Sequence, residues 1–196
     1  RERRVDVIVG TQMIAKGHDF PHLTLVGVMQ TEQLLNMPDF RAVERTFQQV
    51  VQVAGRAGRT RPDTRVIMQT LIPDHPVIVA ITRYDYEAML TEEEQNRRQA
   101  GLPPFAYMAR CVFSSLEAPH LEQTVKRIAK TLALPGLKVM GPALAPLGQL
   151  RGRYRWHLLL TAGKRATLHR ALNHLQQTKI PGHVKMKIDV DPYDML

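Results

Sequence analysis

The sequence lacks features that define several common protein classes. Its 196 residues include a single cysteine, Cys111, so no disulfide can form within the chain and a zinc site built from cysteines is excluded. No apolar run approaches the roughly twenty residues that cross a bilayer, and no secretory signal pattern is present. These absences favour a cytoplasmic protein without a membrane partner.

Two nucleotide-binding motifs are also missing. The sequence contains no G-x-x-x-x-G-K-[ST] loop, which cradles nucleotide phosphates in many ATPases. It has no acidic motif of the D-E-x-H type that would hold magnesium. We therefore expect the chain alone to be unable to hydrolyse ATP.

Positive charge is present in excess but unevenly distributed. The net charge is +9, yet residues 1–105 carry 13 basic and 13 acidic residues, whereas residues 106–196 carry 14 and 5. A basic segment beside a neutral one predicts a polyanionic partner for the basic segment. A merely solubilising surface is the alternative.

The most distinctive motif is Gln52-Val53-Ala54-Gly55-Arg56-Ala57-Gly58-Arg59. Glycine lets the backbone approach a ligand closely, and a guanidinium binds phosphate through two parallel hydrogen bonds. Alone, the motif is also compatible with a glycine-rich helix end that carries solvated arginines. A second motif, Gly10-Thr11-Gln12-Met13-Ile14-Ala15-Lys16-Gly17-His18-Asp19-Phe20-Pro21, lies between two apolar segments and favours the phosphate-binding interpretation.

Residues 1–104 predict an incomplete α/β lobe followed by helices. Strands at 5–10, 24–29 and 66–71 are expected to belong to a parallel sheet. A helix capped by Asp39 has apolar residues at a 3.6-residue period and ends near Arg56. A further helix is expected from Val77 to Met89, and Thr91 with Glu94 predicts a capping box that starts a short charged helix.

Residues 105–196 predict the order βαββαβ. The expected strands are 107–115, 137–145, 153–161 and 184–190, and the expected helices are 119–133 and 164–178. This order is typical of a ferredoxin-like split βαβ sandwich. Alternation along the third strand places Tyr154 and Trp156 toward the core and Arg151, Arg153 and Arg155 outside.

The two motifs together resemble motifs V and VI of superfamily-2 helicases. Their wording is similar to that of the primosomal protein N′ (PriA) family, the DNA helicases that restart stalled replication forks. Further matches are Leu102-Pro103-Pro104-Phe105, Gly141-Pro142, Arg151-Gly152-Arg153-Tyr154-Arg155-Trp156 and Asp189-Val190-Asp191-Pro192.

The resemblance implies an α/β fold with a partial RecA-like helicase lobe 2, containing a parallel sheet, at residues 1–72. A helical linker at 73–104 would lead to a basic α+β domain at 105–196 with the ferredoxin-like split βαβ fold. Residue 1 would then fall inside lobe 2, after a zinc-binding insertion, with lobe 1 upstream.

The resemblance also implies residue roles. Arg59 would be the arginine finger on the γ-phosphate, Arg56 its neighbour, and Gln52 a contact near the nucleotide or the attacking water. Arg56 could instead be a structural ion-pair partner of Asp19 or Glu44. The implied ATP-binding residues are Gly17, Asp19, Arg56 and Arg59, and the implied DNA contacts are Thr11 and Lys16, with Arg151, Arg153 and Arg155 expected on phosphates. No metal ligand is expected in this chain.

The implied cofactors are ATP and Mg²⁺, with zinc held by residues outside this chain. The implied partners are forked and single-stranded DNA, other primosome proteins and the acidic tail of single-stranded-DNA-binding protein. Lys164, Arg165 and His169 are expected to dock that tail, because helix amino termini favour anions. The implied location is the bacterial cytoplasm, in association with the nucleoid.

These inferences predict the carboxy-terminal part of an ATP-dependent 3′-to-5′ DNA helicase that recognises stalled forks and takes part in primosome assembly. The alternative is a non-catalytic nucleic-acid-binding module with a ferredoxin-like domain. Such a module would carry an exposed aromatic pair on its sheet, for which Tyr107, Phe113, Tyr154 and Trp156 are the candidates. An RNA helicase of the same superfamily would not be expected to contain the segments at 102–105 and 189–192.

Overall fold

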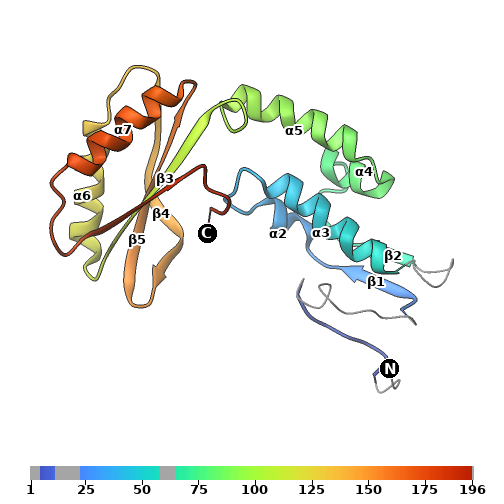
Figure 1. Cartoon of the computed structure of the whole chain (residues 1–196). Coiled ribbons are helices and arrows are strands. Elements are labelled where there is room, and N and C mark those ends of the chain that lie inside the picture. The colour runs from blue at the N-terminus through green and yellow to red at the C-terminus, as the bar shows by residue number, and fades with distance from the viewer. Residues whose placement is uncertain (1–4, 12–22, 58–64, 196) are drawn as a thin grey trace. The chain divides into compact units, whose positions relative to one another are not determined.

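The chain divides into two compact units (Figure 1). The computed structural model describes residues 5–11, 23–57 and 65–195. The first unit takes in residues 1–37 and 41–93, and the second takes in residues 38–40 and 94–196. Each unit has its own hydrophobic core.

The first unit is built on a parallel pair of strands. Leu25 pairs with Arg65 and Val28 with Met68, so the predicted parallel sheet is confirmed for these two strands. A parallel pair requires a crossover connection, and helices provide it. The elements of this unit are β1 (Leu25–Val28), α2 (Thr31–Leu35), α3 (Ala42–Ala57), β2 (Arg65–Met68), α4 (Pro76–Arg83) and α5 (Tyr86–Ala100), the last of which runs on into the second unit.

Helix α3 has the amphipathic pattern that the sequence predicts. Its buried Phe47 and Val50 pack with apolar residues of α4 and with Met89 of α5, while Val28 and Met68 contribute from the strands. On the other face of the strand pair, Leu25 and Ile67 remain 54% and 58% exposed.

Two expectations for the first unit are wrong. Residues 5–11 form no strand, and Val7 and Val9 are exposed, because an apolar segment becomes a strand only when a neighbouring ladder pairs with its backbone. Helix α3 begins at Ala42, three residues after the expected cap at Asp39. The intervening Pro38–Phe40 segment belongs to the second unit.

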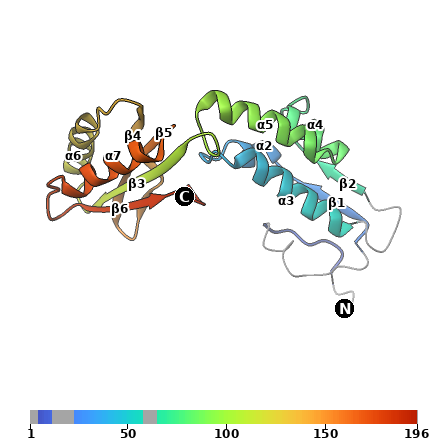
Figure 2. The same cartoon turned by 45° about the horizontal axis from the view of Figure 1, so that its top comes forward.

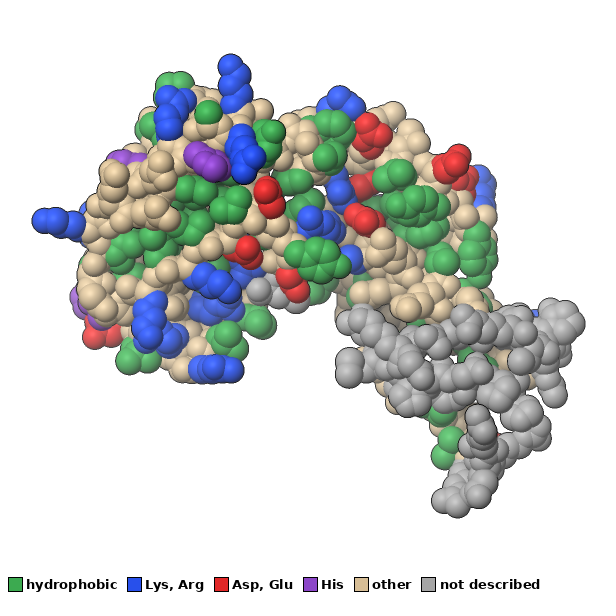
Figure 3. Space-filling view, in the orientation of Figure 1, with side chains coloured by type: hydrophobic (Ala, Val, Ile, Leu, Met, Phe, Trp, Pro, Cys, Tyr) green, Lys and Arg blue, Asp and Glu red, His purple; other side chains and the backbone are tan. Residues whose placement is uncertain are grey.

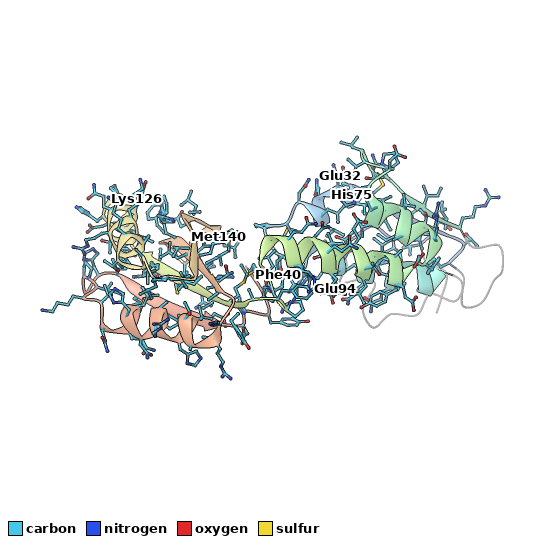
Figure 4. All side chains as sticks on the ribbon, turned by 90° about the horizontal axis from the view of Figure 1, so that it is seen from above. Glu32, Phe40, His75, Glu94, Lys126 and Met140 are labelled. Atoms are coloured by element: carbon cyan, nitrogen blue, oxygen red, sulfur yellow. The ribbon has the colours of Figure 1, made fainter. Side chains whose placement is uncertain are left out.

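The junction between α4 and α5 also differs from the expectation. His75, labelled in Figure 4, starts α4 by accepting a hydrogen bond at Nδ1 from the Val77 amide. Tyr84 then adopts a left-handed conformation with φ 55°, which ends α4. The Asp85 carboxylate accepts from the Ala88 amide and starts α5, so Thr91 lies inside a helix and caps nothing.

The second unit has the predicted βαββαβ order. Its four strands form one antiparallel sheet in the order β4-β5-β3-β6, which is the ferredoxin-like arrangement. The elements are β3 (Tyr107–Ser115), α6 (Ala118–Thr131), β4 (Leu137–Leu150), β5 (Arg153–Ala162), α7 (Arg165–Gln177) and β6 (Lys185–Val190). The expected fold class is confirmed.

Both helices of this domain pack on one face of the sheet (Figure 2). The core between them contains Phe113, Leu121, Leu158, Leu160 and Leu175, each fully or almost fully buried. The alternate strand residues therefore lie on the opposite face, which no helix of the domain covers. We call this opposite side the open face.

Strand β4 bends where the Gly141-Pro142 motif falls. Gly141 has φ 100°, and a Cβ at this position would lie 2.8 Å from the carbonyl oxygen of His157 on β5. Only glycine fits this backbone conformation and this close approach. The motif therefore holds β4 against β5 through an irregularity in their pairing.

Candidate functional site

The last turns of α3 carry the first part of the candidate phosphate-binding motif. Gln52 is exposed and lines a shallow hollow together with Phe47 and Tyr86. The rings of Phe47 and Tyr86 meet edge to face, with their centroids 5.7 Å apart. Arg56 lies one helical turn after Gln52, so both residues stand on one side of α3. The Gln52 side chain is thus accessible to a ligand.

The remaining residues of the two helicase-like motifs are only partly described. Lys16, Gly17, Asp19 and Arg59 lie outside the described residues. Thr11 is described and exposed, but it does not follow a strand as the sequence predicted.

The three arginines expected to meet DNA differ in their surroundings. Arg151 lies in the turn between β4 and β5 with φ 50° and is exposed. Arg153 donates to the carbonyl oxygens of Ser114 at 3.0 Å and His183 at 3.2 Å. Arg155 donates to the carbonyl oxygen of Leu147 at 3.3 Å. Arg153 and Arg155 are therefore half-buried and held in place rather than fully solvated.

The aromatic residues of β5 lie on the helix side, as alternation predicted. Trp156 packs against the core, but Tyr154 stays 37% exposed at its rim. Both line a shallow groove with Leu144 of β4 and Pro119 of α6. Tyr154 thus points to the predicted side of the sheet, but it does not fill the core as expected, because the groove leaves its ring exposed to solvent.

Two further basic residues share the open face with these arginines, and sequence reasoning missed them. Lys185 and Lys187 of β6 alternate with the core residues Met186 and Ile188. Figure 3 shows Lys and Arg side chains grouped on the lower part of this unit. The alternation along β6 was a usable signal, but only the strand order brings β6 near β5.

Arg110 is buried at 4% exposure on β3, directly opposite Asp189 of β6. Its Nη1 donates to the carbonyl oxygen of Asp194 at 3.1 Å and so holds the segment after β6. Burial, and then the charge of Arg155, lowers the pKa of Arg110, whereas Asp189, Asp194 and Asp39 act in the opposite direction. An arginine stays charged under such conditions.

His157 follows Arg155 on the open face. Burial lowers the pKa of His157, and the charges of Arg110 and Arg155 lower it further. Its ordinary pKa is already below 7, so His157 is neutral near pH 7. The positive charge of this face therefore comes from arginine and lysine and does not depend on histidine protonation.

The amino terminus of α7 carries the residues expected to bind an acidic peptide. Lys164, Arg165 and His169 are all exposed, and the first turn of α7 contains no acidic residue. Arg165 Nε lies 3.4 Å from His169 Nε2, so these two side chains lie side by side. The structure thus brings the three residues together on one helix end.

The described residues contain neither a metal-binding cluster nor a membrane-spanning helix. None of them form a group of three or more His, Cys, Asp or Glu side chains that could hold a metal ion. Cys111 is fully buried, and burial raises the pKa of its thiol to about 12. In the described ranges, no helix is long and apolar enough to cross a membrane.

Known proteins align with the whole of this sequence. The family model for the primosomal protein N C-terminal domain matches residues 98–193. The replication restart protein PriA of Haemophilus influenzae is 38% identical over 200 residues, covering 100% of this chain and 27% of the relative. The chain belongs to the PriA family. Its second unit corresponds to the carboxy-terminal domain of PriA.

Other PriA proteins are similar to this chain to the same degree. That of Bacillus subtilis is 37% identical over 202 residues, with 100% of this chain and 25% of the relative covered. That of Treponema pallidum is 38% identical over 200 residues, with coverage of 100% and 30%. The chain thus spans about a quarter to a third of the length of these relatives, which are named replication restart proteins.

Proposed function

We propose that the chain is the carboxy-terminal part of an ATP-dependent 3′-to-5′ DNA helicase that recognises stalled replication forks and supports primosome assembly. The observation that carries this proposal is the end-to-end similarity to replication restart proteins. Its partners would be forked and single-stranded DNA, primosome proteins and the tail of single-stranded-DNA-binding protein.

The ATP-side residues fit the chemistry of a phosphate sensor. Gln52 is accessible on α3, and Arg56 stands one turn further along the same helix. Gly17, Asp19 and Arg59 would complete the site, with Thr11 and Lys16 on the DNA backbone. Bound ATP with Mg²⁺ would supply the phosphoryl group that the arginines recognise. Any zinc in the longer protein would use ligands other than the buried Cys111.

The isolated 196-residue chain should release no phosphate from ATP above background, with or without forked DNA. The reason is that it has no phosphate-binding lysine loop, and arginines alone cannot replace that loop. A malachite-green phosphate assay checks this expectation. DNA-stimulated turnover by this chain would contradict its assignment as one lobe of a two-lobe ATPase.

The exposed helix end at α7 should bind an acidic peptide. Replacing Arg165 by glutamate reverses one charge beside Lys164 and His169, so the affinity for a labelled acidic tail peptide of a single-stranded-DNA-binding protein should fall roughly tenfold, which corresponds to about 1.4 kcal/mol. Fluorescence anisotropy measures this affinity.

Arg127→Glu provides the matched control, since Arg127 is an exposed arginine on the other helix of the domain. This variant should keep the affinity of the unchanged chain. Equal weakening by Arg127→Glu and Arg165→Glu would show that the peptide senses net charge alone and does not dock on α7.

A further inference from the structure

Basic residues from two strands flank the central strand β3 on the open face. Arg155 of β5 and Lys185 of β6 both pair with Ser114 of β3. In the next row Lys187 pairs with Val112. Strands lie about 4.8 Å apart, so the rows of cations on β5 and β6 stand about 10 Å apart across β3. We call Arg153, Arg155, Lys185 and Lys187 the basic face.

The arginines of the basic face are held in position before any ligand arrives. Arg153 reaches from β5 to the carbonyl of Ser114 on β3 and to that of His183, which precedes β6. Arg155 is held by its hydrogen bond to the carbonyl oxygen of Leu147. A guanidinium has five N–H donors, so donors remain for a ligand oxygen. Side chains that are already ordered lose less conformational entropy when a ligand binds.

The basic face is bounded by acidic residues. Asp189 follows Lys187 on the same side of β6 and lies opposite Arg110. The charge of Asp194 also acts on Arg110. An anionic ligand is therefore attracted to the half of the face near the β4–β5 turn, where Arg151 is exposed, and is repelled from the half near Asp189.

The chemistry of the basic face fits a phosphate backbone and provides no stacking surface for bases. The strand positions that carry these cations include no Phe, Tyr or Trp, because Tyr154 and Trp156 point to the helix side of the sheet. Proteins that hold single strands combine a basic groove with aromatic platforms for the bases. In a duplex the bases are stacked inside, so a protein can hold the phosphate backbone without a stacking platform for the bases.

We propose that Lys185 and Lys187, together with Arg153 and Arg155, bind the sugar–phosphate backbone of duplex DNA without reading its sequence. This inference deepens the proposed function and rests on it, since it names the arm of a fork that this domain holds. It adds the two lysines of β6 to the arginines and assigns the domain to a duplex arm in preference to a single strand.

The test uses the full 196-residue chain and two variants of equal charge. One variant combines Lys185→Gln with Lys187→Gln, which spares the hydrogen bonds that Arg153 makes to the backbone. The control combines Arg127→Gln with Lys130→Gln on α6, two exposed residues on the helix side. Binding to a 25-base-pair duplex and to a 25-nucleotide single strand is measured by anisotropy at several salt concentrations.

We expect the unchanged chain to bind the duplex more tightly than the single strand. The measured quantity is the slope of the logarithm of duplex affinity against the logarithm of salt concentration. In the lysine variant this slope should become shallower by about 1.8, since each phosphate contact on duplex DNA contributes about 0.9. The control should keep the slope of the unchanged chain. Fluorescence of Trp156 verifies that both variants remain folded.

Three outcomes would overturn the proposal, and they differ from one another. Duplex binding with an unchanged slope in the lysine variant would place the DNA on another surface while leaving DNA binding by the domain intact. Tighter binding of the single strand, lost in the lysine variant, would show that the basic face takes a single strand. Absence of binding to either DNA would contradict the DNA-binding role itself.

Discussion

On the proposed function, Arg59→Ala in the full-length protein should reduce ATP turnover by about a thousandfold or more while ATP affinity changes little. An arginine finger stabilises the charge that develops on the transferring phosphoryl group, and its loss typically removes 10³–10⁵ in rate. Because the interaction strengthens only in the transition state, ground-state binding should be spared. Steady-state ATPase assays and equilibrium binding of a labelled nucleotide measure the two quantities.

Arg65→Ala is the control for this experiment. Arg65 is an exposed arginine at the start of β2, a few residues after Arg59 in the sequence. Its replacement should leave turnover unchanged. If Arg59→Ala weakened ATP binding as much as turnover, Arg59 would be a ground-state clamp on the nucleotide instead of a finger.

Arg110→Ala should destabilise the second unit by about 2 kcal/mol, within the usual range for losing a hydrogen bond made by a charged group. The change removes the hydrogen bond to the carbonyl of Asp194 and leaves Asp189 without the cation opposite it. Urea unfolding followed by fluorescence checks this value, and Trp156, the only tryptophan, lies in this unit. The urea midpoint should fall without a change in slope.

The exposed Arg127 again offers a comparison. Arg127→Ala removes a solvated arginine from α6 and should alter the stability by less than about 0.5 kcal/mol. A loss below 1 kcal/mol for Arg110→Ala would show that the buried arginine makes no net contribution and that apolar packing alone holds the segment after β6.

The second unit was predictable from sequence because its signals are local. Alternation of period two defines β5 between Arg153 and Ala162, and a 3.6-residue period defines α6 and α7, so the six elements appear in the expected order. Strand order then followed from the small number of ways in which βαββαβ can fold.

Other features depend on contacts that a local pattern does not contain. The break between α4 and α5 rests on the left-handed backbone of Tyr84, a conformation that a tyrosine rarely adopts. The apolar residues 5–9 match a strand pattern, but a strand also requires a pairing partner.

The candidate site was likewise predicted in part. The arginines of β5 were identified from alternation, whereas their hydrogen bonds to Ser114, His183 and Leu147 depend on neighbours distant in sequence. The burial of Arg110 could not be foreseen either, because its partners lie on β6 and on the segment after it.

The exposed apolar residues of the β1–β2 pair influence how the chain behaves at high concentration. Leu25 and Ile67 present exposed apolar surface on these strands, and such surface favours clustering of copies into aggregates. Residues 1–105 have no net charge to oppose this clustering, since their basic and acidic residues are equal in number. The repulsion that keeps copies dispersed therefore comes from the basic domain, which acts as a built-in colloidal stabiliser for its neighbour.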